Sequence, residues 1–156
     1  MSSILVIILV ILCADFIFNR WLDNLNMKSW SSVVPPEAEG IYDVERYKKS
    51  REYHRAHHRL SQISSWFSFL LSVTLLLTGF FGKADTFFRS YTENPVLLSL
   101  LFFGSLGFLS DILSMPFSLY GIFVVEEKFG FNKMTWKTFL ADKLKTYLLA
   151  IILGGG

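Results

Sequence analysis

The chain has 156 residues, of which 52% are hydrophobic and 17% aromatic, and its mean hydropathy is +0.42. These values exceed those of an ordinary soluble domain and predict a membrane protein. The net charge of +2 gives no indication of a nucleic-acid partner, and the single cysteine, Cys13, excludes a disulfide within one chain.

Charged residues are concentrated between the apolar runs, as insertion into a bilayer requires. We therefore predict an all-α fold, a polytopic membrane helical bundle with about four transmembrane helices. The expected spans lie near residues 4–22, 63–83, 95–125 and 139–156.

The first apolar run, Ile4 to Phe18, is shorter than the ~20 residues that span a bilayer comfortably. A signal peptide is disfavoured, because no basic residue precedes the run and no cleavage site follows it. Residues 19–26 can continue the helix, with Arg20 and Trp21 at the membrane interface, so we interpret the run as transmembrane.

The long polar segment after this span has two parts. Pro35, Pro36 and Gly40 predict an irregular turn over residues 34–42. From Asp43 to Gln62 no helix breaker occurs, which predicts a helix that continues from the cytoplasm into the second span. Its basic side chains are expected to be solvated or to meet anionic lipid headgroups.

This helix carries His54, His57 and His58, and positions four apart share a helix face that could bind a metal ion. A zinc-protease helix reads H-E-x-x-H, whereas Arg55 follows His54 here. Solvated or interfacial histidines are the favoured interpretation, and a metal site is the alternative.

The third span opens with Asn94 as N-cap and Pro95 at the first helical position. A run of ~30 residues would be ~45 Å long and exceeds the ~30 Å hydrocarbon core, so it must tilt, kink or project beyond the membrane. Pro116 is the expected kink site. The fourth run begins near Phe139 and is still apolar at Gly156, which suggests that the chain continues in a longer protein.

Lysines and arginines near the membrane ends number eight over residues 19–62, two over 83–94 and five over 126–145. This alternation predicts that the N-terminus lies outside or in a lumen and that the two basic loops are cytoplasmic.

One face of the third span gathers small and polar residues at steps of three and four, namely Gly104, Gly107, Asp111, Ser114, Ser118 and Gly121. We call this set the polar stripe. Its members could pack helix on helix, since small residues let backbones approach closely in lipid. Alternatively the stripe could line a polar cavity, because a carboxylate at mid-membrane depth costs ~2.5–3.5 kcal/mol and is rarely left facing lipid. Asp15, nearer the end of its span, carries less weight.

No P-loop, nucleophile elbow or dinucleotide fingerprint is present, so we expect no self-sufficient active site in this chain. Three segments nevertheless resemble those of a known family. They are V-P-P-E-A-E-G-I-Y at residues 34–42, S-D-I-L-S-M-P-F-S-L-Y at 110–120 and F-V-V-E-E-K-F-G-F-N-K at 123–133.

The chain resembles the type-1 CAAX prenyl proteases and their bacterial relatives, which are integral-membrane zinc metallopeptidases. The resemblance implies a C-terminal peptidase domain elsewhere in the parent protein, with zinc bound there and neither cofactor nor catalytic residue in this chain. It also implies a water-filled intramembrane chamber, for which Asp111, Ser114 and Ser118 are lining candidates.

The resemblance places a cytoplasmic loop near the catalytic domain, with Glu126, Glu127, Lys128 and Asn132 as its motif residues. Ion pairs among its charged residues are one interpretation, and a solvated turn that bends at Gly130 is the other. Expected partners are the lipid bilayer, the parent's peptidase domain and a peptide or prenylated-protein substrate.

Two functions compete at this point. The chain is either the N-terminal membrane part of a zinc metalloendopeptidase, which forms chamber wall and substrate access, or a non-catalytic membrane scaffold or regulator that keeps this portion of the fold. A bacterial inner membrane is favoured and an endoplasmic reticulum membrane is the alternative.

Overall fold

The computed structural model describes residues 2–29 and 44–155 of the chain, and these ranges form helices joined by short turns. The expected turn at residues 34–42 lies outside the described residues. The chain divides into two compact units, Met1–Thr78 and Gly79–Gly156, which we describe separately. The predicted all-α fold is confirmed.

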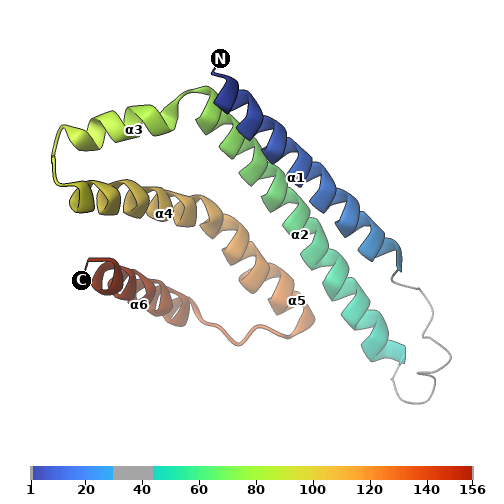
Figure 1. The fold of residues 1–156 in the computed structure, drawn as a ribbon. Helices are drawn as coiled ribbons and strands as arrows, with labels where there is room; N and C mark the ends of the chain where they lie inside the picture. Colours follow the sequence, from blue (N-terminus) through green and yellow to red (C-terminus); the bar gives the residue numbers. More distant parts are fainter. Residues whose placement is uncertain (1, 30–43, 156) are drawn as a thin grey trace. The chain divides into compact units, whose positions relative to one another are not determined.

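In the first unit, α1 (Ser3–Ser29) and α2 (Val44–Leu77) lie side by side (Figure 1). Phe16 of α1 stacks on Phe69 of α2, with ring centroids 4.2 Å apart, and meets Trp66 edge-on at 4.6 Å. The first apolar run does continue through Arg20 as one helix. The start predicted for the next helix, Asp43, lies outside the described residues, but from Val44 onward α2 runs without a break into the second apolar run.

A polar contact joins the same two helices in the C-terminal half of α1. The guanidinium group of Arg20 donates a hydrogen bond to Gln62 and forms an ion pair with Asp23 at 2.9 Å. Arg20 also lies over the ring of Phe16, 5.5 Å from its centroid. These contacts hold the basic side chain against the helix pair where apolar sequence gives way to polar sequence.

The second unit begins at a helix break that the sequence did not predict. We expected the second span to extend to residue 83, but α2 ends at Leu77 and a separate helix, α3, covers Phe80–Arg89. Gly79 lies between them with φ of 67°, in the left-handed region that glycine adopts most readily. A residue in this conformation cannot continue a right-handed helix, so a new helix starts after it.

The next helix, α4 (Pro95–Tyr120), is capped as predicted: the side chain of Asn94 accepts hydrogen bonds from the backbone N–H groups of Val96 and Leu97. Pro116 lies inside the helix, where it cannot donate a backbone hydrogen bond. The chain then passes into a π-helical segment, η2 (Gly121–Glu126), and the short α5 (Glu127–Phe129). Figure 1 shows that α4 is bent, as a proline and a π-helix within one run favour.

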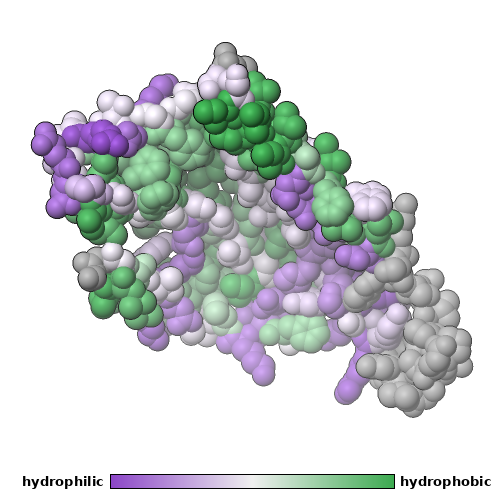
Figure 2. Space-filling model, in the orientation of Figure 1, coloured by the Kyte–Doolittle hydropathy of each residue, from purple (hydrophilic) through white to green (hydrophobic). Residues whose placement is uncertain are grey.

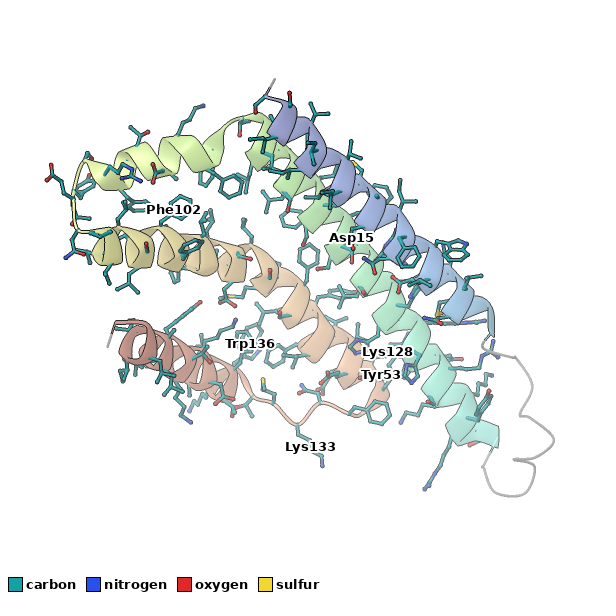
Figure 3. The ribbon with its side chains drawn as sticks, viewed as in Figure 1. Asp15, Tyr53, Phe102, Lys128, Lys133 and Trp136 are labelled. Carbon is teal, nitrogen blue, oxygen red and sulfur yellow. The ribbon has the colours of Figure 1, made fainter. Side chains whose placement is uncertain are left out.

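The last helix, α6, covers Trp136–Gly155. Figure 1 shows α3 and the first part of α4 side by side, and Figure 3 places Phe102 of α4 on the side that faces α3. The α4 helix therefore has α3 on one side, while the contacts described below join its polar stripe to α6.

Within the described residues, three helices are long and apolar enough to cross a membrane, namely Ser3–Met27, Glu45–Leu77 and Pro95–Phe129. Their large apolar side chains are widely exposed, for example Ile4 at 69% and Phe103 at 70%, as expected of surfaces that face lipid. Figure 2 shows hydrophobic residues over the visible N-terminal part of α1. The fourth predicted span corresponds to α6, whose first half carries several charges, and it stays a prediction.

Candidate functional site

The candidate site is a three-residue polar cluster between α4 and α6. The Lys143 side chain donates a hydrogen bond to Oδ1 of Asp111 and forms an ion pair with it, and the hydroxyl of Tyr147 donates to Oδ2 of the same carboxylate. Lys143 and Tyr147 lie one turn apart on α6, so both reach Asp111 from one helix face. Both carboxylate oxygens are thereby satisfied.

The cluster is neither fully buried nor freely exposed, since the side chains of Asp111 and Lys143 retain 32% and 23% of their accessible surface. The ring of Tyr147 meets Phe108 of α4 edge-on, with centroids 5.4 Å apart. An apolar contact between α4 and α6 thus lies next to the polar one.

Aromatic packing fixes the start of α6. Trp136 stacks on Phe123 of η2, with ring centroids 4.2 Å apart and planes 5° from parallel, and Phe139 is 6% exposed. Figure 3 shows Trp136 at the end of α6 that follows the loop. Since α6 is attached to η2 here and to α4 at Asp111, two separate contacts set its position within the second unit.

The remainder of the polar stripe is more open. A Cβ atom added at Gly104 or Gly107 would meet no heavy atom within 4 Å. Ser114 and Ser118 are exposed, and their hydroxyls donate to the backbone carbonyls of Ser110 and Ser114, at 2.7 and 3.4 Å. Gly121, in contrast, is buried. The stripe therefore combines one residue paired with a neighbouring helix and several that present small polar surface.

Sequence reasoning identified Asp111 but missed Lys143 and Tyr147. The count of basic residues over 126–145 includes Lys143, although this residue lies within the predicted fourth span. The available signal was that a lysine inside an apolar segment needs a partner, and few acidic residues lie inside the spans. The i, i+4 spacing of Lys143 and Tyr147 would then have placed both on one face.

The family-motif loop forms a tight turn after α5. Gly130 adopts φ of 70°, and its N–H donates to the carbonyl of Glu127 at 3.0 Å. Asn132 donates from Nδ2 to the Glu127 carboxylate at 2.9 Å and accepts from the N–H of Met134 at 2.7 Å. The bend at Gly130 is confirmed, and Glu127 binds the Asn132 amide across it.

The other motif residues of this loop have different roles. The backbone carbonyl of Glu126 accepts from the N–H groups of Phe131 and Asn132 at 2.9 and 3.3 Å. Lys128 lies over the Phe129 ring, 5.6 Å from its centroid. Figure 3 shows Lys133 pointing away from the neighbouring helices.

The histidines of α2 do not form a metal site with other ligands in the described part of the chain, where no three His, Cys, Asp or Glu side chains converge. His58 instead exchanges a hydrogen bond with Gln62 at 3.2 Å, and His57 meets the Tyr53 ring edge-on at 4.5 Å. The residues described here do not fit a zinc ion.

Comparison with known proteins extends these observations. Residues 23–156 match a protein family described as CAAX prenyl protease N-terminal, five membrane helices. CAAX prenyl protease 1 of Saccharomyces cerevisiae is 32% identical over 153 residues, which cover 91% of this chain and 34% of that protein. Its homologue in Oryza sativa is 31% identical over 147 residues, covering 89% of this chain and 35% of the homologue.

The crystal structure of S. mikatae Ste24p superposes with a TM-score of 0.88 at 32% identity, over 99% of this chain and 38% of that one. The chain thus spans about a third of the length of the curated relatives it matches.

The long apolar helices and the charged cluster that joins α4 to α6 define an integral membrane protein of the polytopic α-helical class. Within that class, the chain belongs to the CAAX prenyl protease family and corresponds to the family's N-terminal membrane region.

Proposed function

We propose that this chain is the N-terminal membrane domain of a zinc metalloendopeptidase that cleaves prenylated C-terminal peptides, and that it forms part of the wall of an intramembrane chamber. The substrate class follows from the names of the relatives, which are CAAX prenyl proteases. Peptide hydrolysis and zinc binding are assigned to parts of the parent protein other than the residues described here.

The observation that carries the chamber proposal is the pairing of Asp111 with α6. Because Lys143 and Tyr147 satisfy this carboxylate, α4 and α6 can stand side by side with charged groups at membrane depth. Ser114 and Ser118 continue the same face and are exposed, so a polar surface extends along α4 beyond the paired residues. A water-filled space is the environment that suits such a surface.

The orientation is part of the proposal. The N-terminal half of α2 and the loop between α5 and α6 carry the basic residues, so we assign both to the cytoplasmic side. The assignment holds equally for a bacterial inner membrane, which the sequence favoured, and for an endoplasmic reticulum membrane. The motif loop at Glu126, Glu127, Lys128 and Asn132 then lies on the side where we place the peptidase domain.

Cysteine accessibility tests the chamber. In the full-length protein without native cysteines, Ser114→Cys and Ser118→Cys should react with a small, membrane-impermeant thiosulfonate reagent. Ile112→Cys is the matched control, because Ile112 lies on the opposite face of α4 and is 42% exposed. If Ser114→Cys and Ser118→Cys are as unreactive as the control in intact membranes, the chamber proposal is wrong.

The enzymatic part of the proposal needs a separate assay. The full-length protein should release the terminal tripeptide from a farnesylated CAAX peptide, and a zinc chelator should stop this release. Residues 1–156 alone should release none. An inactive full-length protein that retains its fold and its accessible stripe would favour the non-catalytic scaffold instead.

A further inference from the structure

The short helix α3 is strongly amphipathic, although it lies in a segment to which the proposed function assigns no role. Positions that recur every three and four residues define one apolar face, which consists of Phe80, Phe81, Ala84, Phe87, Phe88 and, just beyond the helix, Tyr91. The opposite face carries Thr86 and Arg89, with Lys83 and Asp85 at its two borders. The helix has ten residues and is ~15 Å long, and the apolar face runs from its first residue, Phe80, to Phe88 near its end.

The apolar face of α3 has a covered part and an open edge. Phe80, Phe81, Ala84 and Phe88 are half-buried, but Phe87 is 56% exposed and Tyr91 is 70% exposed. The rings of Phe87 and Tyr91 contact each other with centroids 5.1 Å apart. Two adjacent aromatic rings therefore form a continuous open edge.

The polar face of α3 is suited to water. Arg89 donates from Nε to the Asp85 carboxylate at 2.8 Å, and both side chains remain exposed, at 63% and 40%. This hydrogen bond raises the pKa of the Arg89 guanidinium, a group that is charged in water in any case. Lys83 is also exposed. A solvated charged face opposite an open aromatic edge is the pattern of a helix that lies in a membrane interface.

The connections of α3 keep it close to the bilayer. Thr78 and Gly79 alone separate it from the end of the α2 span, a reach of roughly 7 Å. The five residues Ser90–Asn94 lead into the α4 span, a reach of at most roughly 18 Å. Both ends of α3 are thus tethered to helices that cross the membrane.

We propose that α3 is a membrane-surface helix whose aromatic edge, Phe87 and Tyr91, inserts among the lipids on the side of the membrane where α2 ends. Aromatic rings prefer the boundary between headgroups and acyl chains, and Lys83 can extend its charged end toward the headgroups. The partner of this edge is the lipid surface and not another protein segment. The helix anchors the connection between the two spans in the plane of the membrane.

Spin-label accessibility tests this assignment in the full-length protein reconstituted in phosphatidylcholine vesicles. All native cysteines, Cys13 among them, are replaced, and nitroxides are attached at Phe87→Cys and Tyr91→Cys. The matched control is Thr86→Cys, since Thr86 is exposed on the polar face. Power saturation then compares collisions with molecular oxygen, which concentrates in lipid, and with a water-soluble nickel complex.

We expect the ratio of oxygen to nickel accessibility to be several-fold higher at residues 87 and 91 than at residue 86. Equal, high nickel accessibility at all three positions would place the edge in water. Low accessibility to both reagents at 87 and 91 would show that another part of the protein covers the edge. Either result overturns the proposal.

A second measurement uses the unmodified protein, in case the labelled variants fail to fold. Hydroxyl radicals generated in water should oxidise Tyr91 weakly in vesicles, despite its 70% exposure in the chain itself. Oxidation of Tyr91 should rise several-fold when lipid is exchanged for a short-chain detergent that covers the edge less well. Strong oxidation of Tyr91 in vesicles would contradict lipid insertion.

Discussion

The carboxylate of Asp111 on α4 is paired with the ammonium group of Lys143 on α6, 32 residues further along the chain. The pair joins two helices that each carry a charge within or beside a predicted span. Neither charge would be stable against lipid alone, so each explains the presence of the other.

Replacing either member of this pair should lower the free energy of unfolding. Replacing both should lower it by less than the sum of the two single losses. In a cycle of Asp111→Asn, Lys143→Met and the double variant, we expect a coupling free energy of about 1 kcal/mol, the scale of polar contacts between membrane helices. Unfolding in bicelles titrated with denaturing detergent gives the four free energies. Additive single effects would mean that the pair makes no net contribution.

The Tyr147 hydroxyl should contribute less than Lys143, since it supplies one neutral donor while the ring contact with Phe108 remains. We expect Tyr147→Phe to lower the melting temperature in detergent, but by less than Lys143→Met does. Tyr120→Phe is the control, because Tyr120 is 52% exposed on α4 and should tolerate loss of its hydroxyl. If Tyr147→Phe leaves the melting temperature unchanged, the Tyr147 hydroxyl does not contribute to the stability of this cluster.

The same substitution should have opposite effects at two neighbouring glycines. Gly79→Ala places a Cβ atom in the left-handed region at φ of 67° and should cost about 1 kcal/mol of unfolding free energy. Gly82→Ala lies inside α3 with open space around its Cβ and should stabilise by about 0.5–1 kcal/mol. Since neither change creates a clash, the difference isolates backbone conformation. Equal effects in the bicelle unfolding assay would argue against a left-handed Gly79.

The stack between Phe123 and Trp136 should hold the start of α6 in place. We expect Trp136→Leu to lower the free energy of unfolding by about 1 kcal/mol more than the loss of buried apolar area alone would. Trp136→Phe should retain most of the stability, since a phenylalanine ring can still stack on Phe123. Unfolding free energies of the two variants make the comparison. Similar losses of unfolding free energy for the two variants would show that ring stacking does not stabilise this position.

The sequence predicted the parts of the fold that depend on local pattern. Apolar runs marked the first three spans, with residues 19–26 needed to complete the first of them. Asn94 with Pro95 marked the start of α4, and Gly130 marked the turn after α5. Each of these signals is contained within one continuous stretch of sequence. Local chemistry was therefore sufficient to place them.

Other features depend on conformation or on distant residues. Glycine occurs often inside membrane helices, so Gly79 did not reveal that it adopts a left-handed conformation and ends α2. Asp111 indicated that a partner was needed, but helix rotation within the second unit decides that the partners are Lys143 and Tyr147. The π-helix at residues 121–126 has no sequence signature that we could have used.

That π-helical segment has a consequence for how the chain tolerates change. A π-turn accommodates one residue more than an α-turn, which amounts to a rotation of about 100° in an otherwise continuous helix. The regular three- and four-residue spacing of the polar stripe therefore ends at Gly121. The residues after it are rotated around the helix axis relative to the positions that a continuous α-helix would give them. Phe123, which stacks on Trp136, lies within this segment, so the length of the segment should matter as much as its composition. Deleting one residue there would leave all the other side chains in place and still rotate α5 and α6 relative to α4.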